Sequence, residues 1–144
     1  MNDYAEVKLT AREALEIYLE KYPDAHIKEV ELERKSGVFV YEIEGYSGSE
    51  KNEMYIDSND GRVLEIKTQF FKGRYDQITP EVTEKVEGLV NKALEDAGEG
   101  TQLYEYELEV EDLRLELEIK MTRADGIYLN YKYDLESGEI IRKK

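Results

Sequence analysis

The chain has 144 residues and a mass of 16.8 kDa, which is the size of one ordinary domain or of two small ones that share a core. It carries 34 acidic and 20 basic residues, and the resulting net charge of -14 disfavours binding to nucleic acid and to anionic membrane surfaces. Hydrophobic residues make up 40% of the chain, enough to form a core, and the absence of cysteine excludes disulfides.

No window of about 18 apolar residues occurs, so the sequence predicts no transmembrane segment. The first residues, Met1 to Glu6, lack the basic and apolar regions of a signal peptide. These residues are compatible with a cytoplasmic protein and with a chain whose leader or anchor is absent from this sequence.

A capping box opens the first predicted helix. Thr10 is followed three residues later by Glu13, apolar residues then recur at helical spacing, and Pro23 ends the run. Alternating apolar and polar residues then predict four short strands, at 29–33, 38–43, 54–56 and 63–66. The segment 38–43 has apolar residues at both odd and even positions, so we expect part of it to be covered on both faces, where two units meet.

The same order of elements is predicted a second time. Thr79 and Pro80 are the expected cap and first residue of another helix, which ends at Gly98. Strands follow at 104–110, 113–119, 127–133 and 139–141. We therefore expect an α+β protein of two repeats, each with one helix packed on a small antiparallel sheet in the order α-β-β-β-β. The expected boundaries are 1–69 for repeat 1, 70–77 for a short linker and 78–144 for repeat 2.

Four segments of the first half follow a known pattern, namely Leu9 to Ala14, Val30 to Glu33, Val40 to Glu44 and Tyr55 to Leu64. Together they resemble the PepSY domain, a module of the propeptides of thermolysin-type secreted metallopeptidases and of bacterial membrane-attached and secreted proteins. The second half keeps the closing pattern in Tyr133 to Ile141, so its assignment depends on the repeat. The resemblance implies a free-standing tandem PepSY protein with a cystatin-like fold.

The resemblance also implies a function. It suggests a non-enzymatic protein that binds a peptidase, with inhibition or regulation as a further step, outside the cytoplasm and either secreted or membrane-attached. No catalytic, metal-binding or cofactor-binding residue and no cofactor is predicted. The expected partner is a protein, with neither its binding residues nor an oligomeric state assigned. A small-ligand or cation-binding domain and a structural module of a cell-surface protein stay open as alternatives.

Acidic and aromatic residues are the candidate binding features. Alternating glutamates form either the solvated face of a sheet or a surface for a basic partner or Ca²⁺. They are Glu29, Glu31, Glu33, Glu42 and Glu44 in the first half and Glu105, Glu107, Glu109, Glu111, Glu116 and Glu118 in the second. Another set either packs within strands or forms a partner-binding patch, and consists of Tyr104, Tyr106, Tyr128, Tyr131 and Tyr133. Phe70, Phe71 and Tyr75 either wedge between the repeats or form an exposed hot spot.

Three further features have ordinary interpretations. His26, the only histidine, is expected in a loop or in packing. Asp57 to Gly61 resembles the start of a calcium loop, but its glycine is one position early and its distal acid is Glu65, so a hairpin turn is predicted. Arg142 to Lys144 is expected to be a solvated tail.

Overall fold

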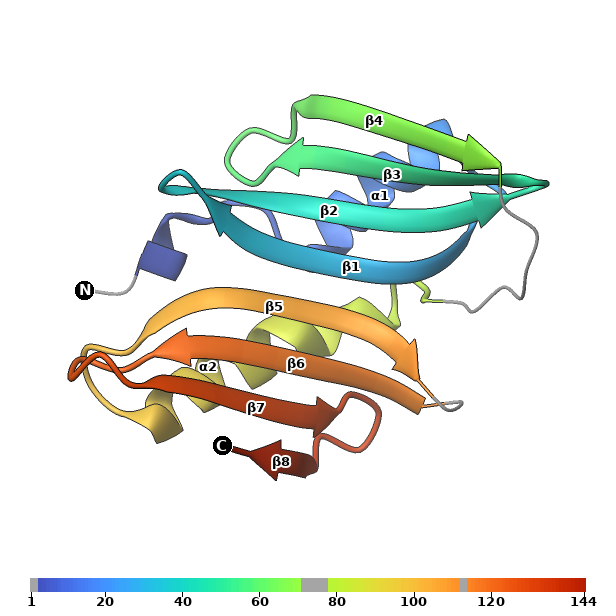
Figure 1. Ribbon diagram of the computed structural model, residues 1–144. Coiled ribbons are helices and arrows are strands. Elements are labelled where there is room, and N and C mark those ends of the chain that lie inside the picture. The colour runs from blue at the N-terminus through green and yellow to red at the C-terminus, as the bar shows by residue number, and fades with distance from the viewer. Residues whose placement is uncertain (1–2, 71–77, 112–113) are drawn as a thin grey trace.

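The computed structural model describes residues 3–70, 78–111 and 114–144 (Figure 1). Within these residues the chain forms two α-helices, two short 3-10 helices and eight β-strands. In chain order they are η1 Asp3–Glu6, α1 Ala11–Lys21, β1 His26–Lys35, β2 Val38–Ser47, β3 Glu50–Asp57, β4 Val63–Phe70, η2 Val82–Lys85, α2 Val86–Ala97, β5 Gln102–Glu111, β6 Arg114–Thr122, β7 Tyr128–Asp134 and β8 Ile140–Lys143. The α+β class predicted from the sequence is confirmed.

All eight strands belong to one antiparallel sheet, in the order β4-β3-β2-β1-β5-β6-β7-β8. The first strand of each half therefore lies at the centre (Figure 1). Here Glu29 to Glu33 of β1 pair with Glu109 to Glu105 of β5, and we call this line of pairing the β1–β5 seam. Because the seam satisfies the backbone groups of two strands that would otherwise be edges, it joins the two halves into one sheet.

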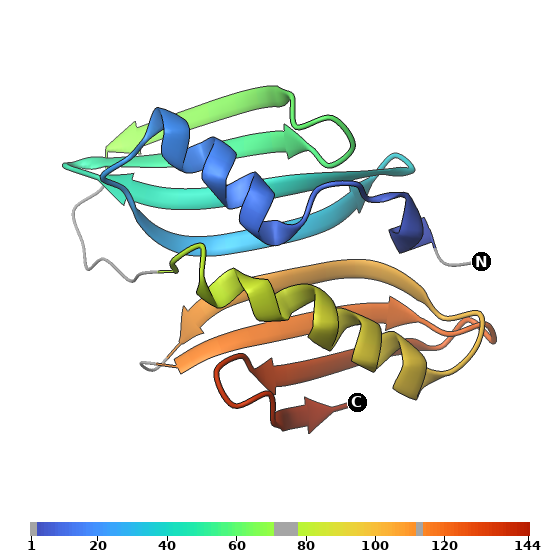
Figure 2. The same ribbon diagram turned by 180° about the vertical axis from the view of Figure 1, so that it is seen from behind.

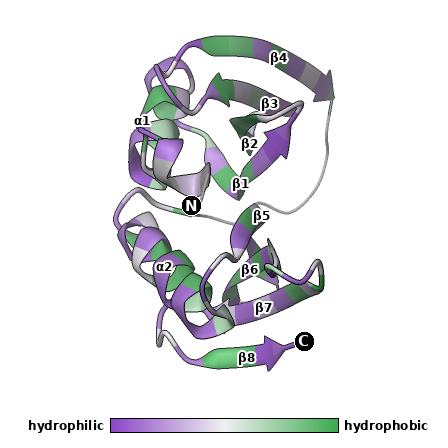
Figure 3. Cartoon of the chain, turned by 90° about the vertical axis from the view of Figure 1, so that its left-hand side faces the viewer, coloured by the Kyte–Doolittle hydropathy of each residue, from purple (hydrophilic) through white to green (hydrophobic). Residues whose placement is uncertain are grey.

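Both helices lie on the same face of the sheet (Figures 2 and 3). Each helix has an apolar stripe at helical spacing, and each strand has apolar side chains at every second position, so these two surfaces bury one another. The fully or largely buried helical residues are Ala11, Ala14, Leu15 and Tyr18 in α1 and Val86, Leu89, Val90, Ala93 and Leu94 in α2. They form one continuous core with the strand residues beneath them.

Several contacts join the two halves on the helical side of the seam. The Tyr106 hydroxyl donates to the Tyr41 hydroxyl at 3.3 Å within the core. The backbone N–H of Ile78 donates to the carbonyl of Ile27 at 2.8 Å. The Glu87 carboxylate of α2 accepts from the backbone N–H of Ala11, at 2.9 Å, at the start of α1. The halves therefore share a core as well as a sheet.

The first helix begins as the sequence predicts, and the second does not. The backbone N–H of Glu13 donates to Thr10 Oγ1 at 3.1 Å, and the N–H of Thr10 donates to Glu13 Oε1 at 2.9 Å, which completes the capping box. The expected cap Thr79 is wrong, because η2 precedes α2 and α2 starts only at Val86. The Thr83 hydroxyl and N–H both donate to the carbonyl of Pro80, at 2.6 and 3.2 Å, and this closes a tight turn before the helix.

Two expectations about where the halves meet are also wrong. Val38 is 51% exposed and Val40 is half-buried, so the outer face of the segment 38–43 is only partly covered, and the halves meet along β1 and β5 while β2 lies one strand away. Phe70, the first residue of the predicted linker, instead ends β4, is 90% exposed and does not wedge between the halves. The rest of that linker, including Phe71 and Tyr75, lies outside the described residues.

Candidate functional site

The sheet face opposite the two helices, which we call the open face, is the largest candidate site. Successive strand residues alternate between faces, so the residues between the buried apolar positions point to this face. Across the four central strands these residues are mostly glutamates. We call them the acidic strip, which consists of Glu42 and Glu44 of β2, Glu29, Glu31 and Glu33 of β1, Glu105, Glu107 and Glu109 of β5, and Glu116 and Glu118 of β6.

Strand register places these carboxylates directly opposite one another. Across the β1–β5 seam, Glu31 pairs with Glu107, and the neighbouring pairs on the same face are also two glutamates. The rows continue outward through the adjacent strands, as Glu44-Glu29-Glu109-Glu116 and as Glu42-Glu31-Glu107-Glu118. Like charges directly opposite on one face of a sheet repel, so the centre of the strip is electrostatically unfavourable when ionised.

The centre of the strip has a raised proton affinity. Partial burial, followed by repulsion from Glu109 and Glu105, raises the pKa of Glu107 to about 7. Burial and then the charge of Glu107 raise the pKa of Glu29 further, and burial is also the main cause of the raised pKa of Glu31. Desolvation disfavours the charged carboxylate, and nearby carboxylates disfavour it again. Part of this charge is therefore neutralised by protons near neutral pH.

Basic side chains neutralise other glutamates of the acidic strip instead. Lys51 Nζ lies 3.4 Å from Glu44 Oε1, and Lys120 Nζ lies 3.4 Å from Glu105 Oε2. Glu116 accepts from Arg114 at 2.7 Å, and this bond and a second from Lys132 outweigh its burial and lower its pKa. Within the described residues, no ion pair joins a cation to the central glutamates Glu29, Glu31 and Glu107. The unneutralised acidity is thus concentrated at the seam.

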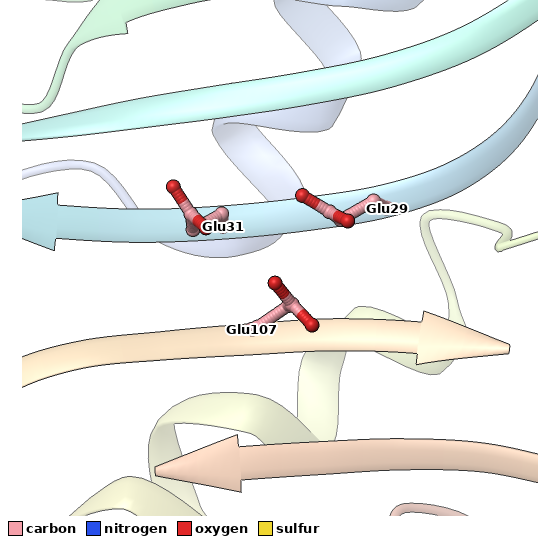
Figure 4. Close-up of side chains that lie close together, drawn as sticks. All are labelled: Glu29, Glu31 and Glu107. Carbon is pink, nitrogen blue, oxygen red and sulfur yellow. The ribbon is translucent and has the colours of Figure 1, made fainter. Parts of the chain in front are cut away.

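The central carboxylates lie close enough to share a cation. One carboxylate oxygen from each of Glu29, Glu31 and Glu107 lies within 4.8 Å of the others, and Figure 4 shows the three side chains facing one another across the seam. A second group of the same kind is Glu31, Glu33 and Glu105. Carboxylate oxygens are the ligands that Ca²⁺ prefers. The strip can therefore take up protons, a cation or the basic groups of a partner.

Tyrosines divide between the core and the open face. Tyr106, Tyr131 and Tyr133 are buried, which confirms ordinary strand packing for these three. Tyr104 and Tyr128 are 42% and 76% exposed and lie with Lys120 and Asn130 around a shallow groove beside the acidic strip. The exposed patch proposed from the sequence is thus limited to two of its five tyrosines.

The remaining residues singled out in the sequence lie at a strand start, in a turn and in the last strand. The expectation that His26 lies in a loop or in packing is wrong, because His26 is the first residue of β1 and is exposed. The turn at 57–61 is a hairpin turn as predicted, in which Asp57 Oδ1 accepts from Asn59 N at 2.8 Å and only Gly61 has a positive φ, of 78°. The predicted solvated tail is wrong for Arg142 and Lys143, because β8 pairs with β7 and Arg142 lies 3.0 Å from Glu118.

The sequence predicts the alternating glutamates of each half, but it does not predict that the two sets lie side by side on one sheet. The alternation of each strand is a local signal, whereas the pairing of β1 with β5 joins residues about 75 positions apart and leaves no signal in either strand alone. The one signal in the sequence is that each half has alternating glutamates on its first strand. This signal predicts a shared acidic face only if the two first strands are already known to be neighbours.

Comparison with known proteins agrees with the sequence analysis of the first half. Residues 8–67 match the family described as peptidase propeptide and YPEB domain, PepSY. This confirms the resemblance that was based on Leu9 to Ile66. No curated protein sequence matches the chain.

The whole arrangement of helices and strands has a counterpart among solved structures. The chain is similar to the crystal structure of a putative lipoprotein from Clostridium difficile 630, with a TM-score of 0.75 and 24% sequence identity. The similarity covers 96% of this chain and 93% of the other. At this identity the likeness shows a common fold. Within the described residues, neither helix is long and apolar enough to cross a membrane.

Proposed function

We propose that the protein is a non-enzymatic binding module of two PepSY units in tandem, which binds a peptidase outside the cytoplasm and inhibits or regulates it. The observation that carries this proposal is the match of residues 8–67 to a family of peptidase propeptide domains. A propeptide acts on its peptidase by contact, so binding without catalysis is the function this match supports. The name of the structural neighbour, a lipoprotein, supports a location outside the cytoplasm.

The tandem organisation is part of the proposal. A helix followed by four strands occurs in each half, and the strand order is mirrored about the seam. The proposed units are residues 1–69 and 78–144, with 70–77 as the connection. Side-by-side pairing of their first strands explains why one wide open face spans both units, where two separate sheets would offer two small faces.

The open face is the proposed docking surface. The helical face is occupied by α1 and α2 (Figure 3). The acidic strip extends over four adjacent strands on the other face. A partner with lysine and arginine side chains would neutralise the central glutamates and relieve their mutual repulsion. Such complementary charge raises association rates and selects against acidic partners. Tyr104 and Tyr128, at one end of the strip, add contact area with polar tips.

The test is capture of secreted thermolysin-type metallopeptidases by the purified protein, followed by inhibition assays at low and moderate salt. The informative variant is Glu105→Gln/Glu107→Gln/Glu109→Gln, which removes the strip's charge along β5. Its control is Glu20→Gln/Glu95→Gln/Glu99→Gln, which removes the same number of carboxylates at exposed positions off the sheet. We expect saturable binding that the strip variant weakens and the control retains. Absence of binding to any such peptidase would refute the proposal.

Cation binding is the second candidate, and the grouping of Glu29, Glu31 and Glu107 favours it. A bound divalent cation would offset the repulsion among these three carboxylates and stabilise the fold. Millimolar Ca²⁺ should then raise the melting temperature at pH 8, and Glu31→Gln/Glu107→Gln should abolish the rise. An equal rise in that variant would rule out this site.

A further inference from the structure

The edge of the sheet at β4 is a second surface with specific chemistry, separate from the open face. Among the described residues β4 pairs with β3 alone, and it is twice as long as β8, the other edge strand. Nearly all of its side chains are exposed, including the apolar Val63, Leu64 and Phe70. An exposed edge presents unpaired backbone N–H and C=O groups that another strand can complete.

The charges on β4 favour a particular partner. Glu65 lies opposite Tyr55 and Lys67 lies opposite Glu53 on β3, so both point to the open face, while Ile66 between them lies opposite Met54 on the helical side. If β4 pairs antiparallel with β4 of a second copy about Ile66, Glu65 of each copy faces Lys67 of the other. A shift of the register by two residues in either direction instead places Lys67 against Lys67 or Glu65 against Glu65. Charge complementarity therefore selects one register, and it lies at the middle of the strand.

We propose that the chain forms a symmetric dimer by antiparallel pairing of β4 with β4 of a second copy, centred on Ile66. A two-fold axis perpendicular to the sheet keeps the faces in common, so the helices of both copies lie on one side and Ile66 meets Ile66 beneath them. On the open face, two Glu65 to Lys67 pairs form across the new interface. Each new pair continues a line of charged side chains across the strands, since Lys67 already lies opposite Glu53 of β3.

The net charge of -14 does not prevent this contact. The nearest strand of the acidic strip is β2, two strands from the edge. In the dimer the two β2 strands are five strand spacings apart, about 24 Å at about 4.8 Å per spacing. This is about three Debye lengths at physiological salt, so repulsion between the two strips is largely screened. The edge itself carries both signs of charge, Glu65 and Lys67, with Arg62 just before the strand.

Sedimentation equilibrium of the full chain from about 10 to 500 µM, in about 150 mM NaCl, tests the proposal. The expected result is a mass that rises with concentration from 16.8 kDa toward twice that value. Glu65→Lys and Lys67→Glu each create two like-charge pairs and should weaken the dimer about tenfold, and the double variant should restore it, because cross-strand charge pairs contribute in this range. Glu139→Lys, an exposed change of the same charge near the other edge, should leave it unchanged.

Three results would overturn the proposal. They are a monomer at 500 µM, single variants that associate as well as the natural sequence, and a double variant that does not recover. Thermal unfolding of each variant at low concentration shows whether the monomer is intact, because Lys67 also lies 5.2 Å from the ring of Tyr55 in its own chain. The dimer does not depend on the proposed peptidase binding, so either proposal can fail without the other.

Discussion

Replacing Glu107 by glutamine should stabilise the protein, and the gain should depend on pH. Glu107 lies in the middle of a row of four glutamates, and its pKa rises from the ordinary 4.5 to about 7 in the folded chain. The folded state therefore binds this proton more tightly than the unfolded state between these two values. Its contribution to stability is fully present below pH 4.5 and is lost as the pH rises through 7. Glutamine keeps the shape and carries no charge at any pH.

The size of the effect follows from the shift of the pKa. A tenfold change in proton affinity corresponds to about 1.4 kcal/mol, so a rise from 4.5 to about 7 gives an upper limit of about 3.4 kcal/mol. The side chain is only partly buried, and solvent and salt screen its repulsion, so we expect about 1–2 kcal/mol at pH 8. This should raise the melting temperature by about 3–8 °C. At pH 5 the gain should fall below about 0.5 kcal/mol, since the carboxyl is then protonated in the folded state.

Urea unfolding followed by circular dichroism at pH 5 and pH 8 measures both values. The matched control is Glu20→Gln, at an exposed position of α1, which makes the same chemical change away from the strip. Added NaCl should reduce the gain at pH 8, because it screens repulsion between partly exposed charges. A gain at pH 8 no larger than that of the control, or an equal gain at both pH values, would refute the account of the strip.

Substitutions at three further positions test the packing and the helix cap. Leu15→Ala removes a fully buried side chain of α1 and should cost about 2–5 kcal/mol of unfolding free energy in urea, and a loss below about 1 kcal/mol would contradict the helix-on-sheet core. Gly45→Ala places a Cβ 2.5 Å from the Tyr18 hydroxyl and should cost about 1–3 kcal/mol, so a neutral result in the same assay would show that Tyr18 is elsewhere. Thr10→Ala removes the capping box of α1 and should lower stability by about 1 kcal/mol, whereas Thr10→Ser should lose much less.

The local part of the fold could be predicted from the sequence. The capping box at Thr10 and Glu13 and the alternation along Val30 to Glu33 fixed the first helix and the faces of the strands, because both signals depend on neighbours within a few residues. The start of α2 was missed, since the Thr79-Pro80 pattern fits a helix cap and the competing turn depends on Thr83 contacting Pro80. Local signals therefore gave the class and the order of elements, but not every boundary.

The candidate site could be predicted only in pieces. The alternating glutamates of each half could be read from the sequence. Their union into one acidic strip depends on Glu31 lying opposite Glu107, and that pairing is set by long-range register. For the same reason, the segment 38–43, which has apolar residues on both faces, led to the wrong expectation that the halves meet there. The raised pKa of Glu29 depends in part on this union, because its second cause after burial is the charge of Glu107 across the seam.

The most direct test of the central claim, that the acidic strip binds a protein partner, is the affinity for a captured thermolysin-type metallopeptidase as a function of salt. The measurement compares the natural sequence with Glu105→Gln/Glu107→Gln/Glu109→Gln between about 20 and 300 mM NaCl. The account predicts that affinity for the natural sequence falls steeply with salt and that the variant binds more weakly with a flatter dependence. Equal affinity and equal salt dependence for the two proteins would contradict it and leave the strip as a solvated sheet face.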